Sequence, residues 1–232
     1  MTKRTKLLVA GLAILAMPFL ATFVYLRVIR DDPPPRLTVA DVTTTTTAAT
    51  APGDSGAAPT GIEGTWTVGG GSVVAYRVSE TLFGQSAEAQ GRSEGVTGTL
   101  QVADTRVTAA ELTVDMATFS SDESRRDGQF NGRIMAVDQF PTATFTLTTP
   151  IELDAEPEDG TKVSVQAVGD LTLHGVTRSV TFPLTVLRSG STVAVDGSLD
   201  ITFADYAIDN PSGGPAQVGD SGALEVLLVL GR

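Results

Sequence analysis

Cysteine is absent from the 232 residues of the chain, and histidine occurs once, as His174. The chain therefore has no disulfide, no thiolate zinc ligand and no cysteine nucleophile. A zinc site with one histidine would need mainly carboxylate ligands, so neither a metal ion nor another cofactor is predicted. The sequence also lacks a phosphate-binding loop, a dinucleotide fingerprint and a Gly-x-Ser-x-Gly elbow. These absences disfavour catalysis, and we predict no catalytic residue.

Basic residues are scarce in most of the chain. Six basic and four acidic side chains give residues 1–60 a net charge of +2, whereas ten basic and twenty-three acidic side chains give residues 61–232 a net charge of −13. A domain with this much negative charge repels phosphate backbones, which argues against a nucleic-acid partner.

Only one long run of the sequence is free of charged side chains, at residues 7–26. A helix of this length spans ~30 Å, about the thickness of the hydrocarbon core of a bilayer. Basic residues precede the run, and no small-x-small cleavage site follows it closely. We predict that residues 1–30 form an uncleaved, single-pass membrane anchor with the rest of the chain on the extracytoplasmic side. The alternative is a cleaved signal peptide, which would give a secreted protein.

Residues 31–60 are rich in Pro, Thr, Ala and Gly and contain no aromatic side chain. Such a composition cannot bury enough apolar surface to fold, so this segment is predicted to be a disordered linker. A linker of this length spans ~100 Å when it is fully extended. It would connect the anchor to one folded domain at residues 61–232.

Apolar side chains recur at every second position in the folded part, which is the period of a β-strand with one buried face. Strands of this kind are typical of antiparallel sheets. The alternation is clear in residues 73–80, 95–104, 109–116, 162–173, 180–186, 193–203 and 223–230.

One segment breaks the alternation. Ser120 and Glu123 have the spacing of a capping box, and Phe130 and Ile134 lie about one helical turn apart. This pattern predicts one short helix, interrupted by Gly128, beside the sheet. The domain is therefore predicted to be all-β, with about eight antiparallel strands in one sheet or barrel and a single short helix.

Small residues interrupt the apolar face of the predicted strands. Gly98, Gly169 and Gly197 occupy inward positions, where glycine either leaves space or allows a strand to bend. Eight strands enclose either a packed core or room for one small ligand. If the glycines leave space, the cavity is lined by Val, Leu, Ile and Phe and suits an apolar chain. If they only supply curvature, the interior is filled.

Four segments carry recognisable motifs in a fixed order. Residues 64–84 begin with Trp-x-Val, and residues 120–147 contain an Arg-Asp pair and a Phe-Pro-x-Ala-x-Phe segment. Residues 169–184 read GDLTLHGVTRSVTFPL, and residues 201–230 contain aromatic-x-Ile-x-x-Pro before a closing strand. Together, over about residues 62–230, the chain resembles the YceI-like family of polyisoprenoid-binding proteins.

The resemblance implies a lipocalin-like, eight-stranded antiparallel barrel that lies outside the cytoplasm, binds a long isoprenoid or similar lipid, and has no established catalysis. It also allows a homodimer. We predict a membrane-tethered protein that holds or carries an isoprenoid-like or quinone-like chain inside the barrel. A surface-displayed structural or interaction barrel with a filled core is the alternative. The predicted ligand-binding residues are Tyr76, Val78, Phe83, Gly98, Met116, Phe119, Phe130, Ile134, Met135, Phe145, Gly169, Leu171, Phe182, Gly197, Ile201 and Phe203.

Three further residues are candidates for contact with a lipid headgroup. His174 stands before Gly175 between two apolar runs, which is the pattern of a hairpin turn, and headgroup contact at the barrel mouth is the alternative. A catalytic role for His174 would require a carboxylate partner and a nucleophile. Arg125 and Arg126, next to Asp127, either hold the helix against the barrel or meet the headgroup.

Overall fold

The computed structural model describes residues 34–44, 61–82, 84–213 and 216–232. The chain divides into two units, Met1–Pro34 and Pro35–Arg232, and the sheet belongs to the second. The predicted anchor and most of the predicted linker lie outside the described residues. Within the described ranges, no helix combines the length and the hydropathy needed to cross a membrane.

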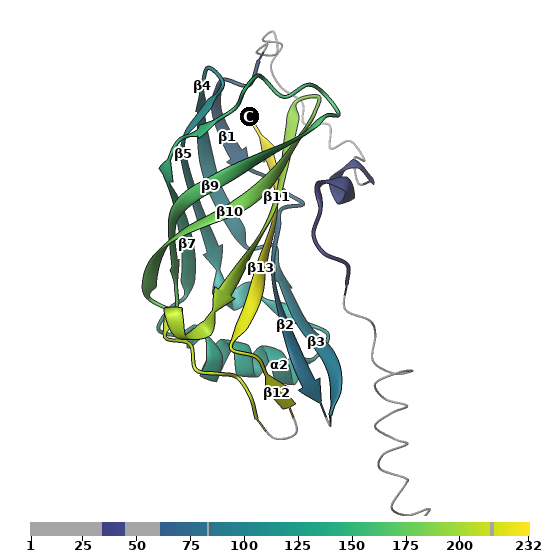
Figure 1. Ribbon diagram of the computed structural model, residues 1–232, viewed down its shortest axis with the longest axis vertical. Helices are drawn as coiled ribbons and strands as arrows, with labels where there is room; N and C mark the ends of the chain where they lie inside the picture. Colours follow the sequence, from purple (N-terminus) through teal and green to yellow (C-terminus); the bar gives the residue numbers. More distant parts are fainter. Residues whose placement is uncertain (1–33, 45–60, 83, 214–215) are drawn as a thin grey trace, which may run out of the picture. The chain divides into compact units, whose positions relative to one another are not determined.

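In these ranges thirteen strands form one sheet, and all their pairings are antiparallel (Figure 1). The strands are β1 (Gly64–Val68), β2 (Val73–Leu82), β3 (Gln85–Ser93), β4 (Val96–Ala103), β5 (Arg106–Asp115), β6 (Ser120–Ser121), β7 (Thr142–Thr149), β8 (Ile151–Glu152), β9 (Lys162–Leu173), β10 (Val176–Ser189), β11 (Thr192–Thr202), β12 (Ala216–Val218) and β13 (Ser221–Gly231). The helical elements are the 3-10 turns η2 (Val39–Thr44), η3 (Met116–Thr118) and η5 (Phe203–Tyr206), the α-helix α2 (Ser124–Gln129) and the π-helical turn η4 (Phe130–Ile134).

The sheet closes into a barrel. Its order β1-β4-β5-β7-β9-β10-β11-β13 returns to β1, because β13 pairs with β1 as well as with β11. β2 follows β1 along the same edge of β13, and β3 pairs with β2 before the chain enters β4. The ring therefore has eight strands, and two of them are interrupted. One interrupted strand consists of β1 and β2, and the other consists of β3 and β4. The predicted all-β, eight-stranded antiparallel barrel with one short helix is confirmed.

Two apolar clusters fill the barrel, because the strands alternate between inward and outward side chains. The helix-end cluster lies beside η4 and comprises Met116, Phe119, Phe130, Met135, Val137, Ala143, Leu171, Leu173, Ile201, Tyr206 and Ile208. The Trp66 cluster comprises Ile62, Trp66, Val96, Ile151, Leu153, Ala167, Val195, Leu228 and Leu230. In the second cluster the Nε1–H of Trp66 donates to the carbonyl of Ile62 at 2.8 Å, so the one buried indole is fully satisfied.

The ring of backbone hydrogen bonds is interrupted between β10 and β11. Their ladder runs from the Ser189–Thr192 pair to the Leu184–Gly197 pair and then stops, although both strands continue. Pro183 is the next residue of β10, and proline has no N–H to donate to a neighbouring strand. Beyond this point β10 and β11 diverge (Figure 1). We call residues 176–183 of β10 and residues 198–202 of β11 the split.

The helical segment begins later than the sequence predicted. α2 follows Glu123, whose side chain makes no capping hydrogen bond. Ser120 lies instead in β6, which pairs with β3, so the predicted capping box is wrong. Ser121 supplies the local polar contacts: its Oγ accepts from the Glu123 N–H and bonds the carboxylate of Asp127 at 2.6 Å. Gly128 lies within α2 and does not interrupt it.

Part of the predicted linker is ordered and packs on the outer face of the barrel. Val39, at the start of η2, is fully buried against Leu187, Ala194 and Leu227. Its N–H donates to the carboxylate of Asp196 at 2.7 Å. The prediction of a disordered linker was therefore wrong for residues 35–44. Very few apolar side chains are enough to hold a segment in place when the outer face of a strand supplies apolar partners.

Charged side chains hold the same segment. Arg36 Nη1 lies 2.8 Å from Glu225 Oε1, and that oxygen also accepts from Arg77 Nε at 2.9 Å. Arg77 in turn pairs with Glu88. Arg77 and Glu225 are both buried although they occupy the outer face of β2 and β13. Each buried charge has an opposite partner, as burial of a charge requires.

Candidate functional site

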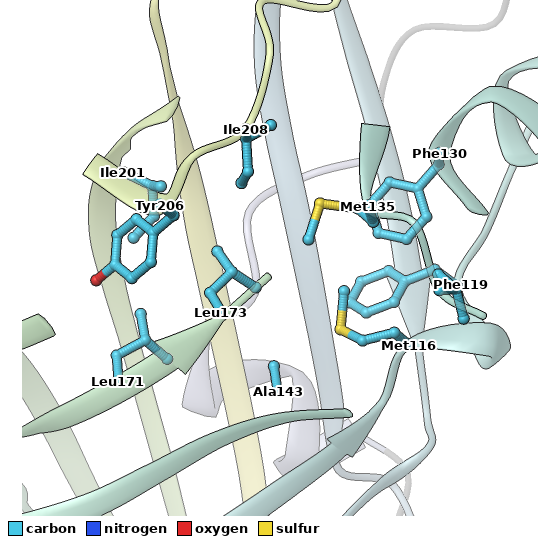
Figure 2. Close-up of a cluster of buried hydrophobic side chains, with 11 residues drawn as sticks. Met116, Phe119, Phe130, Met135, Ala143, Leu171, Leu173, Ile201, Tyr206 and Ile208 are labelled. Atoms are coloured by element: carbon cyan, nitrogen blue, oxygen red, sulfur yellow. The ribbon is translucent and has the colours of Figure 1, made fainter. Parts of the chain in front are cut away.

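A cavity of about 110 Å³ lies in the middle of the barrel, lined by residues of both clusters. Met116, Phe119 and Ala143 line it from the helix-end cluster, and Val96 lines it from the Trp66 cluster. Figure 2 shows the helix-end cluster, in which the two methionines and two phenylalanines gather on one side. Apolar side chains dominate the lining, so the cavity favours an apolar occupant.

The volume limits what the cavity holds. An engineered apolar cavity of ~150 Å³ binds benzene, a ring of six carbons. By that comparison, a cavity of about 110 Å³ holds about four or five carbons, which is one isoprene unit. A longer chain therefore requires side chains at one end of the cavity to move.

The structure brings many of the predicted ligand-binding residues together. Those that line the cavity are Met116, Phe119, Phe145, Leu171, Phe182 and Gly197. Those that pack in or against the helix-end cluster without lining the cavity are Tyr76, Phe130, Ile134, Met135, Ile201 and Phe203. Val78 lies beside Gly222 and away from the cavity lining, and Phe83 lies outside the described residues.

The glycines do not open the interior as predicted. A side chain at Gly169 would collide with the ring of Phe145, and one at Gly98 would collide with Leu112. Only Gly197 lines the cavity. The prediction of open space was therefore wrong for Gly98 and Gly169. Each of these glycines makes room for a bulky side chain from the neighbouring strand.

The lining residues that the prediction missed are mostly aliphatic side chains on inward strand positions. They include Val74, Val96, Leu112, Val114, Leu199 and Leu224. The alternation of the sequence already placed these residues on the inner face of the sheet. Alternation does not give the height of a residue along the barrel, and height decides whether a side chain meets the cavity or a packed cluster.

Three aromatic rings close the interior next to η4. Tyr76 stacks on Phe130 with ring centroids 4.9 Å apart, and Phe119 lies 5.1 Å from Phe130. Burial of the hydroxyl, opposed by the charge of Arg126 and aided by that of Asp127, raises the pKa of Tyr76 to about 12. Tyr76 therefore presents a neutral hydroxyl at the helix end of the barrel.

The charged residues of α2 make local contacts. Arg126 pairs with Asp122, four residues earlier, and Asp127 bonds Ser121 in β6. Arg125 is exposed. These contacts agree with the interpretation that charges hold the helix against the barrel. Headgroup contact by Arg125 or Arg126 stays a prediction.

His174 forms the hairpin turn that the sequence predicted. It has a φ of +50°, and Gly175 follows with a φ of +75°, as in the two-residue turns that join antiparallel strands. The Nδ1–H of His174 donates to the carbonyl of Tyr206 at 3.2 Å. The ring of Phe140 packs edge-on against the imidazole, with centroids 4.6 Å apart. His174 thereby ties the β9–β10 hairpin to η5.

The YceI-like domain family matches residues 66–230. A polyisoprenoid binding domain from Saccharophagus degradans, implicated in plant cell wall breakdown, has a similar structure at 17% identity and a TM-score of 0.59, over 72% of this chain and 98% of that one. BcnA from Burkholderia cenocepacia has 21% identity and a TM-score of 0.54, over 68% and 95%. The YceI protein of Campylobacter jejuni has 13% identity and a TM-score of 0.50, over 60% and 82%. At such low identities the structural similarity shows a shared fold alone. No curated protein sequence matches the chain.

Proposed function

The chain belongs to the YceI-like family, and we propose that it holds or carries a long apolar lipid, of the isoprenoid or quinone kind, inside the barrel. The observation that supports this most directly is the apolar cavity between the two clusters. The description of the Saccharophagus degradans relative as a polyisoprenoid binding domain supports the same class of ligand.

A long chain occupies the cavity with one isoprene unit and extends toward the helix end. Met116 and Met135 are the side chains best suited to move aside, because methionine is unbranched and adopts many shapes at low cost. Phe119, which lines the cavity, packs against Phe130 of η4, and both rings would shift with them. Binding is thus coupled to repacking of the helix-end cluster, while the Trp66 cluster stays in place.

Membrane attachment is the second part of the proposal. Residues 7–26 are uncharged and long enough to cross a bilayer, and basic residues precede them. An anchor there places the barrel on the extracytoplasmic side, beside the lipid it would bind. Membrane fractionation with sequencing of the mature N-terminus tests this part. A soluble exported protein that begins near Ala51 would show that the anchor is removed.

Native mass spectrometry of the full chain, purified from its own membranes, tests lipid binding. We expect a retained mass of a long-chain lipid on the protein. The variant Ala143→Leu fills the cavity and should lose that mass, because Ala143 lines the cavity. Thr146→Leu adds the same side chain on the exposed face of the same strand and should keep it. A protein that carries no lipid, and that binds none when lipid is supplied, would favour the structural barrel with a filled core.

A further inference from the structure

The split between β10 and β11 lies directly beside the cavity. Phe182 of β10 and Gly197 and Leu199 of β11 all line the cavity. These residues flank the Leu184–Gly197 pair, where the ladder between the two strands ends. The other strands that line the cavity are paired with their neighbours, and Met116 and Phe119 line it from η3 and the residue after η3. The split is therefore the place where a chain in the cavity can reach past the sheet.

η5 covers the split, and side chains rather than a strand ladder hold it there. The Nε–H of Arg178, in the split, donates to the carbonyl of Asp205 at 2.9 Å. His174 donates to the carbonyl of Tyr206, the last residue of η5. Ala207, which follows, has a φ of +52°, a left-handed conformation that costs energy for a residue with a Cβ. These two hydrogen bonds, together with the burial of Tyr206, hold η5 over the split.

Tyr206 brings a polar group to this place. Its side chain is only 3% exposed, and its hydroxyl has no hydrogen-bond partner within the described residues. Figure 2 shows the ring between Ile201 and Leu171, with the hydroxyl pointing away from the two methionines. Leu171 also lines the cavity, and it pairs with Arg178 across β9 and β10. A buried hydroxyl without a partner is rare in folded proteins, because its desolvation is uncompensated.

We propose that the Tyr206 hydroxyl binds the polar end of the lipid at the split, on the β10 side of the helix-end cluster, while the apolar chain runs from there into the cavity. This inference rests on the proposed function. It adds where the ligand's end group lies and in which direction the chain runs.

The surroundings of the hydroxyl define the chemistry of that end group. A single neutral hydroxyl donates one hydrogen bond and accepts others, which matches an alcohol or a carbonyl oxygen. The opposite charges of Asp205 and Arg178 both act on this hydroxyl, and the folded part of the chain carries a net charge of −13. A multiply charged phosphate is therefore a poor match. The ligand class is an apolar chain that ends in one neutral oxygen function.

The test is a competition between two probes of equal chain length. The delipidated full chain in lipid nanodiscs is offered farnesol, a C15 isoprenoid alcohol, and farnesene, the corresponding hydrocarbon, at equal concentration. Native mass spectrometry gives the ratio of the two complexes, which does not depend on how much protein is folded. A lost neutral hydrogen bond lowers affinity about 2- to 12-fold. Tyr206→Phe should lower the farnesol-to-farnesene ratio by that factor and leave farnesene binding unchanged.

Tyr76→Phe is the matched comparison, because it removes the neutral hydroxyl at the helix end of the barrel. It should leave the ratio as it is in the wild type. An unchanged ratio in Tyr206→Phe, or a fall of the ratio in Tyr76→Phe instead, would overturn the inference while the proposed function stands. If the wild type binds neither probe, the proposed function itself fails.

Discussion

Filling the central cavity should stabilise the protein when it carries no lipid. Ala143 lines the cavity from β7 and pairs with Val114 across β5. Ala143→Leu adds three carbons, and burying them is worth ~0.8 kcal/mol each, or ~2.4 kcal/mol in total. An independent figure comes from the cavity itself, since ~24 cal/mol per Å³ over about 110 Å³ gives about 2.6 kcal/mol. Fixing the leucine side chain costs ~0.5–1 kcal/mol.

The net expectation is a gain of about 1.5–2 kcal/mol in the free energy of unfolding. For a domain of this size, that gain raises Tm by about 3–8 °C. Thermal unfolding of the delipidated protein, followed by circular dichroism, measures the change. Ala167→Leu is the control, because Ala167 is also buried but does not line the cavity. Overpacking there should cost ~1–3 kcal/mol.

The two variants should therefore move Tm in opposite directions. If Ala143→Leu lowers Tm as much as Ala167→Leu does, the interior around residue 143 is already filled. That result would remove the physical basis for a ligand inside the barrel. Tm must be compared without lipid, because a bound ligand stabilises the wild type alone.

The remaining predictions concern the outer segment, the helix end and the hairpin turn. Val39→Asp should release residues 35–44 from the barrel. Amide hydrogen exchange should become faster there and new protease cleavage should appear, while the Tm of the barrel changes little. Unchanged protection of these residues would contradict the packing described. Burial raises the pKa of Tyr76 to about 12, so the folded state keeps a proton that the unfolded state loses above pH 10.0, and stability should fall between pH 10 and 12. Urea unfolding should show that the free energy of unfolding falls by about 1.4 kcal/mol at pH 11. If Tyr76→Phe shows the same fall, a group other than Tyr76 causes it. His174→Asn should cost at most ~1.5 kcal/mol, since asparagine tolerates a positive φ. His174→Val should cost ~1–2 kcal/mol more by chemical denaturation, and equal stabilities would argue against backbone strain at the turn.

The period-two alternation was sufficient to predict an antiparallel sheet and its inner face, and the family resemblance added that the sheet closes into a barrel. Leu171, Phe182 and Gly197 came from that alternation, and all three line the cavity. The His174–Gly175 pair was also readable, because few residue pairs adopt positive φ at both positions of a tight turn. These features depend on local backbone geometry, which neighbouring residues determine.

Features that depend on distant partners were not readable in the same way. Val39 belongs to a segment of linker-like composition, and its burial depends on Leu227 far along the chain. Tyr206 follows the alternating residues of β11, so its burial has no periodic signature. Pro183 did carry a signal, since proline cannot donate to a ladder, but only the register of β10 with β11 gives that signal its meaning.

The packing of residues 35–44 on the barrel changes the mechanics of the proposed tether. Nine residues, Arg27 to Pro35, separate the uncharged run from Arg36, which is already fixed to Glu225. Fully extended, nine residues span about 30 Å, a third of what the whole linker would reach. If residues 7–26 do anchor the chain, a tether of nine residues is too short for the barrel to exchange lipid with a distant membrane.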